Sequence, residues 1–368
     1  MTLEKQLRFW LAALAIFIAF LWLFSSVLLP FVSGIALAYL LDPVADRLEA
    51  LGLPRAVAAL SVVLGLFVVL VLALVLLMPL LIEQCQGLAE QLPALAGRLR
   101  EMAAPYADGP LGQYLGADAK ALETNLASAL SQSTGVLTRV VQSVWNGGQA
   151  VLSLLSVLVI SPVVAAYMLV DWDRMIARID GWVPPRHRET VRMLAGRMDG
   201  AVSGFVRGQV SVSFVMGLYY GTGLVLVGLN FGLLIGLMAG FLGIIPYVGF
   251  GSGLVVGLAV ALVQYWPDWH GIVYVLIVFG IGQVIEGYGL TPNWVGRSVG
   301  LHPVWLLFSL FAFGSLFGFV GMLVAVPAAA SIGVLARFAI EQYMASPLYR
   351  EAPPAVAVAE VLPAEEAR

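Results

Sequence analysis

"QVIEGYGLTPNWVGRSVGLHPVW", residues 283–305, separates two long apolar runs and places an acid, Glu286, at the end of the first run. Glycine, proline and asparagine are scattered through the stretch before the second run begins at Pro303. Glycine and proline disfavour the interior of a helix. Apolar runs punctuated in this way predict membrane-spanning helices with breaks, and an acid at such a break is a candidate functional group.

The composition of the whole chain supports this interpretation. Of 368 residues, 61% are hydrophobic and only 11% are charged, and the mean hydropathy is +0.95. A soluble domain has about 25% charged residues, and several runs here reach the roughly 20 apolar residues that cross a bilayer. We therefore predict an all-α polytopic membrane protein with about 5–8 transmembrane helices.

The same composition argues against several classes of function. A net charge of −3 without a cluster of basic residues does not suit a nucleic-acid partner. The chain has a single cysteine, Cys85, and its three histidines lie far apart, so we expect no metal and no cofactor. The sequence contains no nucleophile motif, carboxylate pair or phosphate-binding GxxxxGK[ST] motif, so we do not expect an enzyme.

Charge and polarity divide the chain into six predicted segments. They are an N-terminal transmembrane region (1–82), an extramembrane insert of amphipathic helices (83–148), a transmembrane helix (149–170), an arginine-rich cytoplasmic segment (171–208), a transmembrane core with two broken hairpins (209–341) and a disordered cytoplasmic tail (342–368). The placement of lysine and arginine puts the arginine-rich segment inside the cell and the insert outside. The run Phe9–Leu41 is either two short helices or a re-entrant hairpin, since Pro30 and Gly34 interrupt it.

Two stretches of the transmembrane core resemble each other at a constant offset of 72 residues (300 − 228). The matching positions are Gly228, Leu229, Leu234, Val248 and Gly249 in the first stretch and Gly300, Leu301, Leu306, Val320 and Gly321 in the second. Each stretch is interrupted, at IPYVG (245–249) and at FGFVG (317–321). We predict two broken hairpins in an inverted repeat, which is typical of secondary transporters. Chance is the alternative, because glycine and leucine are abundant.

A set of short motifs occurs in a fixed order along the second half of the chain. The motifs are FVRGQ (205–209), IPYVG (245–249), EG (286–287), TP (291–292), VGRSVGLHP (295–303) and AVP (325–327). This set resembles the autoinducer-2 exporter family, also described as PerM-like permeases. The resemblance implies a multi-pass transporter of the bacterial inner membrane that assembles as a homo-oligomer, expected to be a pentamer. Members have been linked to export of a signalling furanone and to sodium/proton exchange, so the resemblance does not fix the substrate.

Nine residues are candidates for binding the transported solute or ion. They are Glu286, Arg207, Gln209, Pro246, Gly249, Thr291, Pro292, Asn293 and Arg297. An ionisable group inside a span costs about 2.5–3.5 kcal/mol to insert and is functional by default, and burial of a carboxyl group favours proton binding. The alternatives for Glu286 are a solvated helix end or a pair with Arg297. Arg207 is either a clamp for an anionic or polyhydroxylated solute or an interface anchor.

These observations lead to a functional hypothesis. The breaks near Pro246 and Gly249 free backbone groups that must face protein or a wet cavity, and His302 is either a proton relay or a helix cap. We predict a secondary transporter that moves a small polar solute or a cation, coupled to H⁺ or Na⁺, by alternating access. Its partners would be the solute, the coupling ion and membrane lipid. The alternative is an oligomeric channel or a membrane scaffold.

Overall fold

The computed structural model describes residues 3–107, 149–295, 300–346 and 349 of the chain. The regular structure within these residues is entirely helical. In chain order the elements are α1 (Leu3–Leu23), α2 (Ser25–Ala50), α3 (Arg55–Ala107), α6 (Gln149–Trp182), η1 (Pro185–His187), α7 (Arg188–Leu226), α8 (Gly232–Leu242), α9 (Val248–Tyr265), α10 (Trp269–Val284), η2 (Ile285–Val295) and α11 (Pro303–Ala345). Seven helices in this part of the chain are long and apolar enough to span a membrane, which confirms the predicted class.

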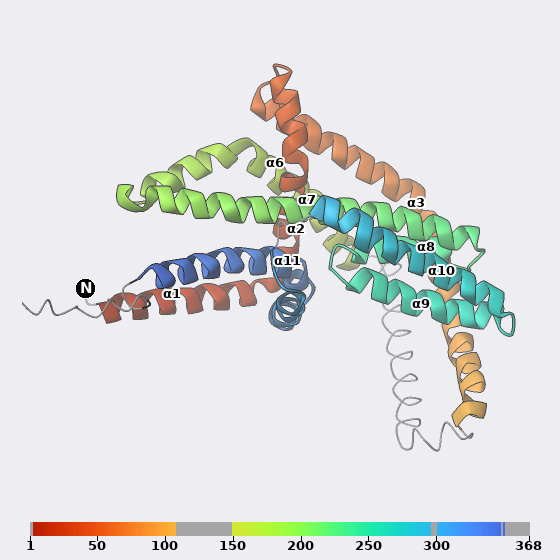
Figure 1. Ribbon diagram of the computed structural model, residues 1–368. Helices are drawn as coiled ribbons and strands as arrows, with labels where there is room; N and C mark the ends of the chain where they lie inside the picture. The colour runs from red at the N-terminus through yellow and green to blue at the C-terminus, as the bar shows by residue number, and fades with distance from the viewer. Residues whose placement is uncertain (1–2, 108–148, 296–299, 347–348, 350–368) are drawn as a thin grey trace, which may run out of the picture.

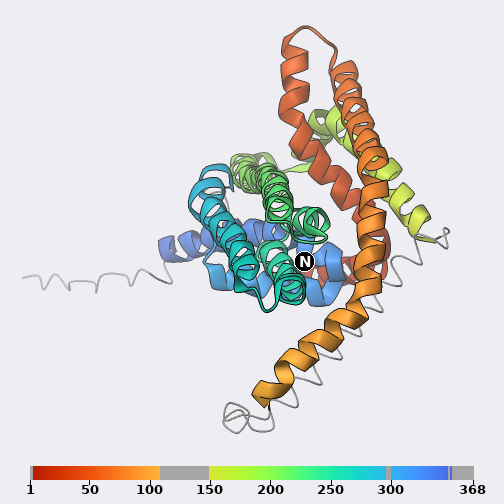
Figure 2. The same ribbon diagram turned by 90° about the vertical axis from the view of Figure 1, so that its right-hand side faces the viewer.

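The helices form two groups (Figures 1 and 2). The first group consists of α2, α3 and α6, which pack around a small apolar cluster of Ala38, Leu41, Ala59, Val63, Ala165 and Leu169. Helix α3 runs along one side of the molecule (Figure 2). Few of its apolar side chains between Arg55 and Leu88 are buried, and many, such as Val75 and Leu76, are exposed in the single chain. This exposure is expected of a helix that faces lipid or a neighbouring membrane protein.

The second group is the core, which contains α7 to α11 and the main apolar cluster of the chain. Helix α7 runs through its centre (Figure 1) and packs closely on α8. Gly217 and Gly221 of α7 face Gly236 and Gly240 of α8, and a Cβ atom on Gly236 would overlap the backbone of Gly221. Small residues at these four positions therefore allow the two backbones to touch, as in other membrane helix pairs.

Both predicted interruptions are present. Helix α8 ends at Leu242 and α9 begins at Val248, and between them Pro246 lacks an amide donor and Tyr247 has a left-handed φ of 67°. Helix α11 is broken at Gly318, whose φ of 61° and ψ of −140° are accessible almost only to glycine. The two halves of α11 consequently point in different directions (Figure 1).

The stretches that resemble each other in sequence also share local geometry. Gly228 (φ 79°) and Gly300 (φ 56°) both have a left-handed backbone just before the apolar run. After each break a glycine packs against the preceding arm. A Cβ atom on Gly249 would overlap the carbonyl oxygen of Ala239, and one on Gly321 would overlap that of Phe313. The shared geometry argues against chance as the origin of the sequence repeat.

The N-terminal half differs from the sequence-based expectation in its details. The run Phe9–Leu41 lies in two successive helices, α1 and α2. Helix α3 continues without a break to Ala107, so residues 83–107 extend a membrane helix instead of forming separate short helices. The rest of the predicted insert, 108–148, lies outside the described residues.

Two polar segments in the second half of the chain are also more helical than predicted. Residues 171–208 form the ends of α6 and α7, joined by η1, and Arg192 of α7 pairs with Asp180 of α6 at 2.7 Å. Residues 285–295 form the π-helix η2, which continues directly from α10. The break expected directly after Glu286 is therefore absent from residues 285–295. Glycine and proline are tolerated inside membrane helices, where local π-type adjustments can satisfy the backbone groups they free.

Candidate functional site

A small cavity lies beside the break between α8 and α9, and we call it the break cavity. Its volume is about 10 Å³, roughly the space that one water molecule or one small ion needs. Helix α7, the α8–α9 hairpin and η2 line it. The lining residues are Val212, Ser213, Met216, Tyr220, Ala239, Gly243, Tyr247, Gly249, Phe250 and Glu286.

Glu286 supplies the charged group of the break cavity. It lies in the first turn of η2, one helical turn after Gly282, whose missing side chain leaves room for the hydroxyl end of Tyr220. Glu286 is half-buried, and within the part of the chain that the structure describes no hydrogen bond or ion pair joins it to another residue. Because the helix continues to Val295, Glu286 faces a cavity inside a span instead of ending a helix.

Two hydroxyl groups of α7 also belong to the break cavity. Ser213 is 5% exposed and Tyr220 is 1% exposed, and neither hydroxyl oxygen has a hydrogen-bond partner among the described residues. A buried polar group without a partner costs about 1–3 kcal/mol, and such groups are rare in native structures. Two of them beside a carboxyl group mark this cavity as the candidate site.

Two other predicted residues shape the same cavity. Gln209 is buried, and its Nε2 atom donates to the carbonyl oxygen of Gly243 at 2.6 Å. This bond satisfies a carbonyl that the end of α8 would otherwise leave without a partner. Gly249 lets the start of α9 lie against the end of α8. The structure therefore brings Glu286, Gln209 and Gly249 together at the break that contains Pro246.

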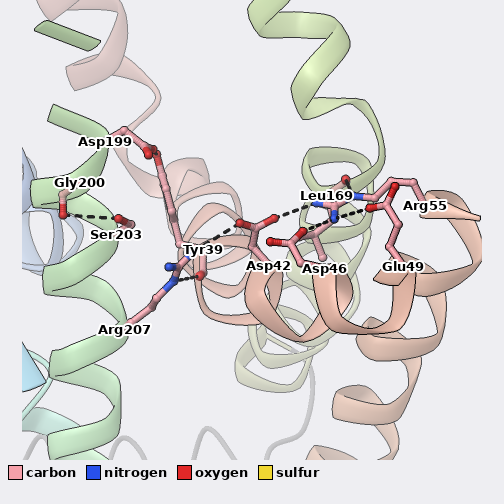
Figure 3. Close-up of polar contacts among 10 residues, drawn as sticks. All are labelled: Tyr39, Asp42, Asp46, Glu49, Arg55, Leu169, Asp199, Gly200, Ser203 and Arg207. Atoms are coloured by element: carbon pink, nitrogen blue, oxygen red, sulfur yellow. Dashed lines mark hydrogen bonds and ion pairs between the residues drawn. The ribbon is translucent and has the colours of Figure 1, made fainter. Parts of the chain in front are cut away.

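Arg207 belongs to a different region, where α7 meets α2 (Figure 3). Its Nε atom donates to the Tyr39 carbonyl oxygen at 2.6 Å, and its Nη2 atom donates to the Asp42 carboxylate at 3.4 Å. The Tyr39 hydroxyl donates to Asp199 of α7 at 3.0 Å. These contacts connect α2 to α7. They also mean that the Arg207 guanidinium is already bonded to other residues of the chain.

Arg55 extends this network on the other side of Asp42. Its guanidinium donates to Asp42 at 2.8 Å, to Asp46, and to Glu49 at 3.2 Å, and its Nε atom donates to the Leu169 carbonyl oxygen at 3.0 Å. The paired cluster is our name for Tyr39, Asp42, Arg55, Asp199 and Arg207, because these polar groups find partners within the chain. A cavity of about 70 Å³ opens beside the paired cluster.

The remaining predicted residues that the structure describes do not line the break cavity. Thr291, Pro292 and Asn293 lie further along η2, where the Asn293 side-chain amide donates to the Gly289 carbonyl oxygen at 2.7 Å. Arg297 lies outside the described residues. His302 is the N-cap of α11, and its Nδ1 atom accepts from the Val304 amide at 3.3 Å. A role in binding for Thr291, Pro292, Asn293 and Arg297 stays a prediction.

Sequence reasoning missed Ser213 and Tyr220, although a signal was present. Together with Gln209 they occur at i, i+4 and i+11 in the largely apolar second half of α7, which places all three on one face. It also missed Asp42 as the partner of Arg207. No local pattern joins residues 165 positions apart.

The fold and the break cavity define a polytopic α-helical membrane protein with a core of interrupted helices. Among the described residues, no group of three or more His, Cys, Asp or Glu side chains is arranged to hold a metal ion. The chain belongs to the AI-2E family of transporters, because the family model described as "AI-2E family transporter" matches residues 11–340. The predicted family is thereby confirmed.

Similar proteins from distant bacteria cover most of the chain. "Putative transport protein YrrI" of Bacillus subtilis (strain 168) is 29% identical over 315 residues, which are 84% of this chain and 86% of the relative. "Putative permease PerM" of Escherichia coli (strain K12) is 29% identical over 313 residues, with the same two coverages. The similarity therefore includes both helix groups and is not restricted to the core.

Proposed function

We propose that this protein is a secondary transporter of the bacterial inner membrane, which moves a small polar solute or a cation by alternating access. The solute is of the size and polarity of autoinducer-2, and the coupling ion is H⁺ or Na⁺. The observation that carries the proposal is Glu286, a carboxyl group that lines a small cavity beside a break in a membrane helix. An ionisable group in such a place marks an ion or substrate pathway.

The internal repeat supports the same mechanism. Each predicted repeat consists of a long span followed by a broken hairpin: α7 with α8–α9, then α10–η2 with α11. Opposite orientation of the two repeats in the membrane would be the inverted arrangement found in many secondary transporters, with the site at the breaks. In this proposal the two hairpins move against α7 and α10, and the glycine contacts between α7 and α8 form a smooth surface for that movement.

Glu286 is the group that responds to the driving gradient. A proton or a cation changes the conformational equilibrium only if it binds one state better than the other. In the described conformation the cavity is small and the acid lacks a hydrogen-bond or ion-pair partner among the described residues. Protonation or cation binding would remove the cost of a partly buried charged carboxylate, and movement of the hairpin would expose the acid further to one side of the membrane.

The exposed apolar surface also indicates what surrounds the protein in the membrane. The apolar side chains of α3 need a covering of lipid or of a neighbouring copy. We propose that lipid and other subunits of a homo-oligomer share this role, with a pentamer as the expected assembly. Export is the proposed direction of transport.

Transport by purified protein in proteoliposomes tests this proposal. Uptake of a panel of small polar solutes and of ²²Na⁺ is measured under imposed pH and Na⁺ gradients. Glu286→Gln keeps the shape of the side chain but cannot carry a charge, so gradient-driven transport should fall to background while solute exchange without a gradient continues. Glu286→Asp should retain part of the coupling with a shifted pH profile.

The matched control is Glu341→Gln, which changes an exposed acid near the end of α11. It should transport as the wild type does. Wild-type rates and an unchanged pH dependence for Glu286→Gln would contradict the proposal. Single-channel currents through the wild-type protein in a planar bilayer, without coupling to a gradient, would favour the channel alternative.

A further inference from the structure

The two hydroxyl groups without partners in the break cavity call for an explanation of their own. Neighbouring hydroxyl groups of the same kind are satisfied: the Tyr219 hydroxyl donates to the Val278 carbonyl oxygen at 3.1 Å, and the Ser252 hydroxyl donates to the Val248 carbonyl oxygen at 2.7 Å. Ser213 and Tyr220 are more deeply buried than these and have no such bond within the described residues. Their oxygens are therefore available as ligands.

These two oxygens and the Glu286 carboxylate belong to one cavity. Ser213 and Tyr220 lie seven residues apart on α7, close to two helical turns, so their side chains share a face. Glu286 comes to the same place from η2, and the three residues line the break cavity together. These three side chains thus reach the cavity from two elements that the fold packs against each other, whereas the other lining residue with a hydroxyl group, Tyr247 of the α8–α9 hairpin, is 59% exposed.

The charge of the cavity decides which ligand it suits. The C-terminal end of α8 and the N-terminal end of α9 both lie at the cavity, so their opposite dipole fields partly cancel. Glu286 is the charged residue among the lining side chains. A carboxylate with neutral oxygen donors is a ligand set for a hard cation, and a single carboxylate balances a single positive charge.

We propose that Ser213, Tyr220 and Glu286 bind one dehydrated monovalent cation of about the size of Na⁺. The volume of about 10 Å³ accommodates one such ion and excludes an organic solute in this conformation. This inference rests on the proposed function, because it concerns the same site. It adds that Ser213 and Tyr220 are ligands that determine which cation binds. A solute must then bind elsewhere, or only after the hairpin opens.

Binding of Na⁺ to the purified full-length protein in detergent tests the assignment. Thermal stability is titrated with NaCl against choline chloride at constant ionic strength, and apparent affinity is taken from the saturating part of the curve. The wild type should show saturable stabilisation by Na⁺. Because a hydrogen bond or ligand contact to a charged group is worth about a factor of ten or more in binding, Tyr220→Phe and Ser213→Ala should each weaken the apparent affinity about tenfold.

The matched controls are Tyr219→Phe and Ser252→Ala, which remove hydroxyl groups that already have partners. Both should keep the wild-type affinity for Na⁺. The assignment is wrong if the wild type shows no saturable effect beyond choline, or if Tyr220→Phe and Ser213→Ala bind Na⁺ as tightly as the controls. The first result would mean that the cavity binds no Na⁺, and the second that Na⁺ binds without the hydroxyl groups of Ser213 and Tyr220.

The outcome separates this inference from the proposed function. Absence of Na⁺ binding, together with loss of gradient-driven transport in Glu286→Gln, would overturn the cation site and leave the transporter. Saturable Na⁺ binding, together with wild-type transport in Glu286→Gln, would support the cation site and contradict the proposed role of Glu286 in coupling.

Discussion

Helix α7 contributes to both the paired cluster and the break cavity. The polar groups of the paired cluster bond to one another, whereas three polar groups of the break cavity have no partners among the described residues. Arg207 and Gln209 are two residues apart on α7, so their side chains leave the helix in nearly opposite directions, one toward α2 and the other toward α8. On the α2 side, guanidinium groups, carboxylates and a phenol bond to one another (Figure 3). On the α8 side, two hydroxyl groups and a carboxyl group face a cavity without partners among the described residues.

This difference indicates a difference in role. A polar network that is satisfied within the chain needs no ligand, and it fastens the N-terminal helices to the core. A set of buried polar groups that is not satisfied carries a free-energy cost, which a bound ion can offset. The comparison also changes the interpretation of Arg207, since a guanidinium held by Tyr39 and Asp42 is not free to clamp a solute in this conformation.

The largest expected effect comes from breaking the paired cluster at Arg55. Arg55→Ala leaves Asp42, Asp46 and Glu49 without their shared cation. These pairs are partly exposed, so each contributes modestly, and we expect a loss of about 2 kcal/mol in the free energy of unfolding in total. Unfolding in detergent, followed by circular dichroism, measures it. The Na⁺ response of stability should remain, because it belongs to the other region.

Arg174→Ala is the control for that change. It removes an arginine whose pair with Asp171 is more exposed than those of Arg55, and its effect should stay below about 0.5 kcal/mol. An equal loss for both variants would show that the paired cluster is ordinary surface charge.

A smaller effect on stability is expected at the part of the paired cluster that joins the two helix groups. Arg207→Gln and Asp42→Asn, alone and combined, form a double-mutant cycle. Their side chains are 38% and 37% exposed, so solvent screens the pair and we expect a coupling of about 0.5–1 kcal/mol. Unfolding free energies measure the coupling, and transport kinetics are recorded in parallel. Zero coupling combined with a raised KM for solute would reverse the comparison and restore Arg207 as a solute ligand.

Features of the fold that depend on local interactions could be predicted from the sequence, whereas features that depend on contacts between distant residues could not. The breaks at Pro246 and Gly318 were predictable, because proline and glycine act on their own backbone. The π-helix around Glu286 was not, since packing and not local preference decides whether Gly287, Gly289 and Pro292 open a membrane helix. A local pattern selected Glu286 and Gln209 as candidates, and both lie at the break between α8 and α9, whereas the pairing of Arg207 with Asp42 depends on how distant helices dock.

The smallest expected effect compares two adjacent tyrosines of α7 in the absence of Na⁺. Tyr219→Phe removes a hydroxyl group that donates to the Val278 carbonyl oxygen, so the protein should lose somewhat less than about 1 kcal/mol of stability. Tyr220→Phe removes a buried hydroxyl group that has no partner among the described residues. Its removal should leave stability unchanged or raise it slightly, because the cost of an unsatisfied polar group disappears. Thermal unfolding in Na⁺-free choline buffer measures both variants. The opposite signs are the test: if Tyr220→Phe loses as much stability as Tyr219→Phe, the Tyr220 hydroxyl is already satisfied without an ion, and the contrast between the two sides of α7 does not hold.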